Sequence, residues 1–173
     1  AIIPIGTGNT GIATASSSPI FEALVAASSS NATSTTFIAG LMTGGFNSDY
    51  GPTAATLNTT QGMYFAATST VNGNWQAVVK NGTGATQYLD TGVASTTQGD
   101  NFQKLRIVTV PLTNSTTQVY FYIDDVLRGW ITSTATGTTR PLVNPRVSVG
   151  TSAAGLAKNI RVGYVMMYWK RFR

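Results

Sequence analysis

The chain of 173 residues contains no cysteine and no histidine. Without cysteine there is no disulfide framework and no thiolate metal site. Without histidine, the commonest general base and the commonest zinc ligand are missing, and a serine–histidine or cysteine–histidine nucleophile is excluded. Asn47 and Asp49 offer oxygens that suit a calcium ion, and an ordinary turn explains the same two residues. We expect neither a cofactor nor a metal.

Charge is also scarce, because charged residues make up only 10% of the chain against roughly 25% in average proteins. The carboxylates are Glu22, Asp49, Asp90, Asp100, Asp124 and Asp125. Hydrolysis of a glycoside needs two carboxylates that act together. No two of these are spaced to share one face of a strand, and Asp124 and Asp125 are explained by a turn. We therefore expect that the protein is not an enzyme.

The positive charge, a net +5, is scattered except at residues 169–173, "WKRFR". No run of the sequence resembles a basic arm for nucleic acid. No apolar run approaches the length of a membrane-spanning helix. We expect neither nucleic acid nor a membrane as a partner.

The abundant residues are threonine, serine, asparagine and glycine, which favour strands and turns over helices. Short apolar segments recur between Asn-Gly, Gly-Pro and other turn signals, a pattern typical of a β-sandwich or barrel. The predicted strands cover 21–27, 36–43, 63–68, 75–80, 86–92, 102–110, 118–123, 126–132, 146–150 and 160–169. The segment 21–27, "FEALVAA", is also compatible with one or two helical turns. The prediction is an all-β protein.

The stretch "VYFYIDDVLRGWIT", residues 119–132, reads as a hairpin whose two-residue turn is Asp124-Asp125. Such a turn needs positive φ, which aspartate tolerates. In an unbroken register Val119 faces Trp130, and Tyr120 faces Gly129. Both faces of this hairpin are then apolar, and both faces of the last strand, 160–169, are apolar as well. One face must pack on the opposite sheet, and the other must meet something else.

Residues 1–18 are predicted to be an extended N-terminal arm ahead of a single domain, 19–173. The arm begins with an apolar group, Ile2, Ile3, Pro4 and Ile5, on a run of glycine, threonine and serine. Proline suits an extended segment at a sheet edge. A short apolar anchor on a loose tether stabilises its own domain poorly, because ordering the tether costs conformational entropy. We expect this assembly arm to dock on a neighbouring subunit.

Four segments in residues 60–169 are characteristic, namely "FQKLRIVTV", "TQVYFYIDDVLRGWITS", "RPLVNPRVSVG" and "LAKNIRVGYVMMYW". Together they resemble the second half of concanavalin A-like (laminin G/glucanase-type) jelly rolls. In the family a strand often ends in Tyr-x-Asp-Gly, and here Tyr122, Ile123, Asp124 and Asp125 stand in that place, with Asp125 where glycine is usual. The resemblance implies a two-sheet antiparallel jelly-roll sandwich. It does not imply a substrate.

Jelly rolls that are short, rich in threonine, glycine and asparagine, poor in charge and free of cysteine resemble domains on bacteriophage virions. The resemblance implies a non-enzymatic structural protein of a virus particle, such as a capsid decoration or a minor capsid or fibre component. Its partners are then other virion subunits, the major capsid or fibre protein, and copies of itself in a homo-oligomer. Such a protein is made in the host cytoplasm and resides in the virion.

The alternative is an extracellular lectin-like module that binds a surface glycan for attachment. Sugar sites use aromatic rings for C–H faces and planar polar groups for hydroxyls. The same rings also suit the core or a subunit interface, so both interpretations remain open. The candidate aromatic residues are Trp75, Tyr88, Tyr120, Tyr122 and Trp130.

Overall fold

The computed structural model describes residues 2–4, 13–14, 18–28, 35–42, 62–68, 73–80, 86–95, 101–113, 116–134, 142–151 and 159–169. Within these ranges all regular structure is β-strand, which confirms the predicted all-β class. The strands are β1 (Ile2–Pro4), β2 (Ala13–Thr14), β3 (Pro19–Ser28), β4 (Thr35–Met42), β5 (Gly62–Thr68), β6 (Asn74–Lys80), β7 (Gln87–Ala94), β8 (Gln103–Pro111), β9 (Thr116–Ile123), β10 (Val126–Thr134), β11 (Leu142–Thr151) and β12 (Asn159–Trp169). The segment 21–27 is therefore part of a strand and not a helical turn. In this described part of the chain, no helix is long and apolar enough to cross a membrane.

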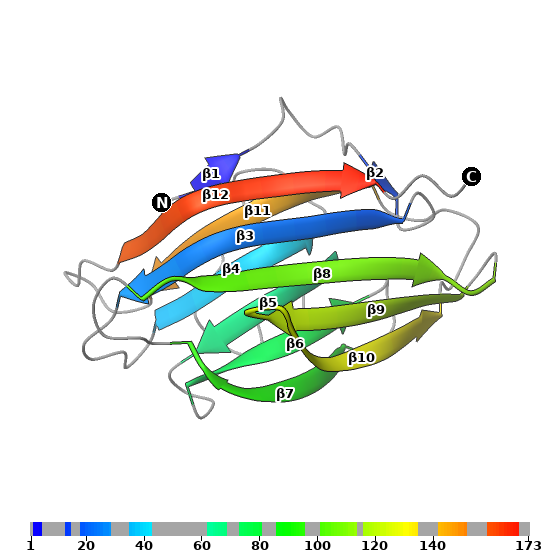
Figure 1. Ribbon diagram of the computed structural model, residues 1–173, viewed down its shortest axis with the longest axis horizontal. Helices are drawn as coiled ribbons and strands as arrows, with labels where there is room; N and C mark the ends of the chain where they lie inside the picture. Colours follow the sequence, from blue (N-terminus) through cyan, green and yellow to red (C-terminus); the bar gives the residue numbers. More distant parts are fainter. Residues whose placement is uncertain are drawn as a thin grey trace.

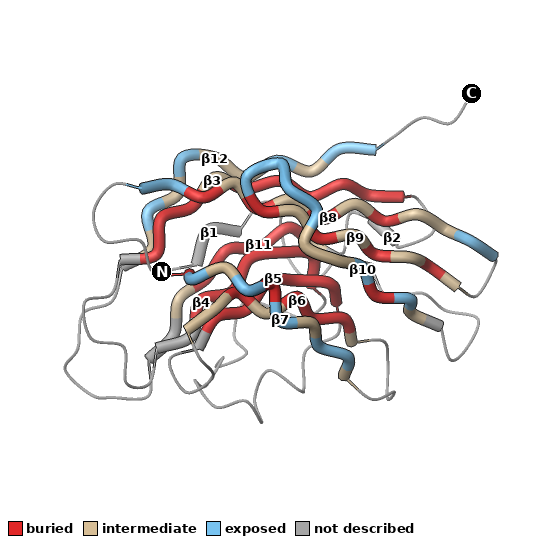
Figure 2. The backbone as a smooth tube through the Cα atoms, turned by 60° about the horizontal axis from the view of Figure 1, so that its bottom comes forward, coloured by how far each residue is buried: buried red, intermediate tan, exposed pale blue. Residues whose placement is uncertain are grey.

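The described strands form two antiparallel sheets that pack face to face (Figures 1 and 2). The seven-stranded sheet has the order β1-β11-β4-β5-β6-β7, with β2 also paired to β11. The five-stranded sheet has the order β10-β9-β8-β3-β12. The predicted two-sheet antiparallel jelly roll is thereby confirmed.

The core lies between the two sheets, where alternate residues of the facing strands point inward. Along β8 and β9, buried residues alternate with partly exposed ones, as expected for strands with one face on a core. The ring of Phe65 packs edge-on against Phe121, with ring centroids 5.3 Å apart, and so joins the two sheets. The largest inward side chains are Phe21, Phe37, Leu41, Phe65, Trp75, Leu105, Ile107, Phe121 and Ile123.

The two sheets differ on their outer faces. The outer face of the seven-stranded sheet carries a second buried apolar cluster, which consists of Ile38, Met42, Tyr64, Ala66 and Val78. The middle strands of that sheet, β4, β5 and β6, are therefore buried on both faces, and burial raises the pKa of the Tyr64 phenol. The outer face of the five-stranded sheet instead leaves large apolar side chains exposed, among them Trp130 and Met166. Among the described residues, the outer face of the five-stranded sheet carries four exposed large apolar side chains, Leu127, Trp130, Met166 and Tyr168.

The hairpin of β9 and β10 departs from the predicted register at a β-bulge. Leu127 pairs with Tyr122 and Gly129 pairs with Phe121, so Arg128 is an extra residue in β10. The predicted pairings of Gly129 with Tyr120 and of Trp130 with Val119 are therefore wrong. Trp130 pairs with Tyr120 instead. A one-residue shift moves every later side chain of the strand to the opposite face.

The last strand, β12, contains a second bulge. Val162 pairs with Val25 and Tyr164 pairs with Leu24, which leaves Gly163 as the extra residue. A Cβ atom at Gly163 would lie only 2.9 Å from Leu24 Cδ2, so the strands approach closely at this point. Before the bulge the even-numbered residues face the core, and after it the odd-numbered ones do. This switch explains why the strand looked apolar on both faces.

Part of the predicted arm forms two short strands on the edge of the seven-stranded sheet. Ile2–Pro4 pairs with Arg146–Ser148 of β11, and Ala13–Thr14 pairs with the start of the same strand. Proline at an edge agrees with its missing N–H donor. Ile5 lies outside the described residues. Docking of the arm on a neighbouring subunit stays a prediction, as does the boundary between arm and domain.

Candidate functional site

Cross-strand pairing places aromatic and aliphatic side chains in a line across the outer face of the five-stranded sheet. Each member of this line is the register partner of the next, from β10 through β9, β8 and β3 to β12. We call the line the aromatic row, and its members are Trp130, Tyr120, Val108, Ile20 and Tyr168. Trp130 is 56% exposed and Tyr168 is 40% exposed. The row therefore ends in an accessible ring at each edge of the sheet.

A second register line, the charged row, runs beside the aromatic row. Its members in strand order are Leu127, Tyr122, Arg106, Glu22 and Met166. The Arg106 guanidinium lies 4.6 Å from the centroid of the Tyr122 ring, a cation–π contact. On the other side of the aromatic row, Gln118 pairs with Thr132, and Gln118 Oε1 accepts a hydrogen bond from the Tyr120 hydroxyl at 2.7 Å. Polar groups thus flank the rings on both sides.

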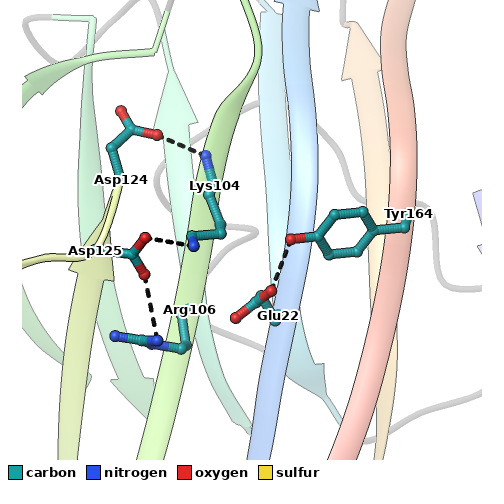
Figure 3. Close-up of polar contacts among 6 residues, drawn as sticks. All are labelled: Glu22, Lys104, Arg106, Asp124, Asp125 and Tyr164. Carbon is teal, nitrogen blue, oxygen red and sulfur yellow. Dashed lines mark hydrogen bonds and ion pairs between the residues drawn. The ribbon is translucent and has the colours of Figure 1, made fainter.

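The turn of the hairpin is tied to β8 next to the charged row. Asp124 and Asp125 have φ of 52° and 63°, which confirms the predicted left-handed turn. The backbone N–H of Lys104 donates to Asp124 Oδ1 at 2.8 Å, and the Asp124 N–H donates to the Lys104 carbonyl at 2.9 Å. Asp125 forms ion pairs with Lys104 and with Arg106, the latter at 3.3 Å (Figure 3). The turn is therefore held by side chains as well as by its own backbone.

These ion pairs shift two pKa values in opposite directions. The hydrogen bond from Lys104 lowers the pKa of the Asp125 carboxyl, and the same bond raises the pKa of the Lys104 ammonium. Both groups are open to solvent, so salt screens the pair. The two cations at the turn keep the Asp125 carboxylate ionised and hold it in these ion pairs.

Glu22 and Tyr164 form the other polar contact of this face. The Tyr164 hydroxyl donates to Glu22 Oε1 at 2.7 Å, across the pair of strands β3 and β12 (Figure 3). This bond to a carboxylate raises the pKa of Tyr164 to about 12. Glu22 is 8% exposed although it lies on the outer face. The carboxylate is thus held in place by a neighbouring phenol.

The structure brings together three of the five aromatic residues that the sequence singled out. Tyr120, Tyr122 and Trp130 share the outer face of the five-stranded sheet. Tyr88 belongs to β7 in the other sheet, where it is 50% exposed. The three grouped rings are the centre of the candidate site, and Tyr88 is separate from it.

Trp75 must be removed from the candidate sugar-binding residues. Its side chain is 0% exposed, and its Nε1 donates to Gln103 Oε1 at 2.8 Å inside the molecule. Its ring packs edge-on against Phe65, with centroids 6.2 Å apart. A ring enclosed in this way presents no face to a ligand, so the prediction is wrong for this residue. The polar indole atom is satisfied internally, as buried tryptophan usually requires.

Sequence reasoning missed Tyr164, Met166 and Tyr168, which the bulge at Gly163 turns outward. A glycine inside a strand pattern is the signal that could have indicated the bulge. It also missed the pairing of Glu22 with Tyr164, because 142 positions separate them in the chain. Asn47 and Asp49 lie outside the described residues. Among the described residues, no group of three or more histidine, cysteine or acidic side chains could hold a metal ion.

No protein-family profile matches the sequence, and no curated protein matches it. Solved structures with a similar fold do exist. One is a legume lectin-like domain from Entamoeba histolytica, with a TM-score of 0.59, 12% identity, and coverage of 89% of this chain and 73% of that one. Another is the carbohydrate recognition domain of Emp46p in a potassium-bound form, with a TM-score of 0.57, 11% identity, and coverage of 96% and 76%.

A third similar structure is the Bacillus licheniformis beta-glucanase, with a TM-score of 0.51, 14% identity, and coverage of 89% of this chain and 67% of that one. The fold is a concanavalin A-like jelly roll. At these identities the likeness concerns the fold alone, and a fold hosts many functions. The function of this concanavalin A-like jelly roll must therefore be argued from its exposed face.

Proposed function

We propose that this protein is a lectin-like module that binds glycans through the outer face of its five-stranded sheet. The observation that carries the proposal is the aromatic row with polar groups on both sides. Aromatic rings suit the C–H faces of sugars, and the planar amide of Gln118 and the guanidinium of Arg106 suit hydroxyl groups. The residues that we expect to contact sugar are Trp130, Tyr120 and Tyr122.

The similar folds support a binding role, since one of them is named as a carbohydrate recognition domain and another as lectin-like. The proposal includes the absence of catalysis. Glu22 accepts a hydrogen bond from the Tyr164 hydroxyl, Asp124 accepts one from the Lys104 N–H, and Asp125 pairs with two cations. These three carboxylates, among the described residues, are thus occupied in structural contacts. An extracellular location and attachment to a glycan-bearing surface complete the proposal.

A structural role in a virus particle, inferred from composition, stays a prediction. In that role the same exposed face would contact another virion subunit or a second copy of the chain. The two functions differ in what they require of the isolated protein. A glycan module binds sugar as a free protein, whereas an assembly protein gains its affinity from a partner surface.

A glycan array probed with the full chain tests the proposal. We expect hits that weaken about tenfold or more in Trp130→Ala, since a stacked aromatic side chain in a binding site often contributes at least about 1.4 kcal/mol. Tyr88→Ala is the matched control, because it removes an exposed tyrosine from the other sheet. A blank array, or binding lost with Tyr88→Ala and kept with Trp130→Ala, would contradict the proposal.

A further inference from the structure

Given glycan binding by this face, we propose that the ligand is an extended, unbranched and neutral polysaccharide that lies across the strands, along the aromatic row. The inference rests on the proposed function and adds the class of ligand and its direction. It depends on three observations, namely the length of the row, the two bulges and the balance of charge beside it.

The length of the row exceeds what a single sugar can cover. Neighbouring strands are about 4.8 Å apart, so the four spacings from Trp130 on β10 to Tyr168 on β12 amount to about 19 Å. Tyr120 lies one spacing from Trp130, and the aliphatic Val108 and Ile20 occupy the middle. A ligand that contacts both terminal rings must therefore contain several consecutive sugars in an extended conformation.

The two bulges set the outward direction of the two rings at the ends of the aromatic row. The bulged strands, β10 and β12, are the two edge strands of the five-stranded sheet. If Arg128 were paired in the regular register instead of bulged, Trp130 would lie opposite Val119 and point into the core. If Gly163 were paired regularly, Tyr168 would likewise point into the core. Bulges commonly re-aim side chains next to functional sites. Here two independent bulges turn one aromatic residue outward at each end of the same register line.

The charged side chains beside the row are equal in number and opposite in sign, namely Lys104, Arg106 and Arg128 against Glu22, Asp124 and Asp125. Lys104 and Arg106 pair with Asp125, and Glu22 accepts a hydrogen bond from Tyr164. A polyanionic chain would need cations that are not already neutralised by neighbouring carboxylates. The pattern fits a neutral chain, whose hydroxyl groups reach the polar atoms on both sides while its C–H faces rest on the rings.

Calorimetric titration of the full chain with cello-oligosaccharides and chito-oligosaccharides, from two to six sugars long, tests the inference. We expect affinity to rise about tenfold or more with length and to level off when the row is covered. Tyr168→Ala should abolish this gain, so that short and long oligomers bind the variant with similar affinity, because it removes the far end of the row. Trp130→Ala should weaken binding at every length. Circular dichroism melting confirms that both variants are folded.

Several outcomes would overturn the inference, and they separate it from the proposed function. Affinity that is independent of length, or unaffected by Tyr168→Ala, means that only one end of the face binds sugar. If the array shows hits only for single terminal sugars and neither oligomer series binds, the proposal of glycan binding is kept. The inference of an extended polysaccharide ligand is then refuted. If the array and both series are blank, both fail. A dimer in analytical ultracentrifugation that Trp130→Arg dissociates would assign the face to a second copy of the chain.

Discussion

The side chain of Leu89 on β7 occupies the space that a side chain at Gly129 on β10 would need. Gly129 also has φ of 154°, a conformation that other residues rarely adopt. The two residues come from the edge strands of different sheets, so their contact closes one side of the sandwich. Gly129 directly follows the bulge residue Arg128 and precedes Trp130. The contact with Leu89 therefore connects the packing of the core with the outward direction of Trp130.

Gly129→Ala should therefore destabilise the protein. A methyl group would meet Leu89 and would impose an unfavourable φ, and overpacking of this kind costs about 1–3 kcal/mol. Chemical denaturation monitored by tryptophan fluorescence measures the change. The double variant Leu89→Ala, Gly129→Ala should lose less stability than the two single variants added together. The methyl group at position 129 then fills space that the Leu89 side chain has vacated. Strict additivity would show that the contact is not responsible.

The hydrogen bond between Trp75 and Gln103 offers a second test of the core. Gln103→Leu leaves the buried indole N–H without its acceptor, and we expect a loss of about 1–3 kcal/mol. Gln87→Leu is the matched control, because Gln87 is an exposed glutamine on β7. Equal stability of the two variants in urea denaturation would contradict the assigned role of this bond.

The ion pairs at the hairpin turn predict a dependence of stability on acid. The folded state lowers the pKa of Asp125 below its ordinary value of 3.8. Its contribution is therefore complete above about pH 4 and is lost as the pH falls through the lowered pKa. Asp125→Asn should flatten this acidic loss, and high salt should reduce the difference because both partners are exposed. Parallel stability curves for the variant and the parent protein would refute the assignment.

The contact between Tyr164 and Glu22 predicts a late phenolate titration. The pKa of Tyr164 is raised from 10.0 to about 12, so its stabilising effect is complete below pH 10 and is lost as the pH rises toward 12. The ultraviolet absorbance of the phenolate follows this step, and Tyr164→Phe should remove it. Glu22→Gln should move the step toward pH 10, because the negative acceptor is gone. If the pKa of Tyr164 is the same in Glu22→Gln as in the parent protein, the raised pKa is due to burial alone.

Local features of the chain were readable from the sequence because they depend on neighbours in the chain. Alternating apolar residues and turn signals predicted the long strands from β3 to β12, and Asp124-Asp125 predicted the hairpin turn with positive φ. The absence of histidine and cysteine excluded whole classes of nucleophile and metal site by composition alone. The same local reasoning placed Trp130 on the wrong face of β10. It assumed that side chains alternate without interruption, whereas the bulge inserts one extra residue, Arg128.

Tertiary structure decided which residues share a face and which face stays open. The burial of Trp75 depends on Phe65 and Gln103, and the direction of Trp130 depends on how β10 packs beside Leu89. The bulge at Gly163 likewise depends on the close approach of Leu24, far away in the chain. The physical reason is that a strand's two faces are equivalent until another sheet covers one of them, so a shift of one residue exchanges core and surface without changing the local pattern.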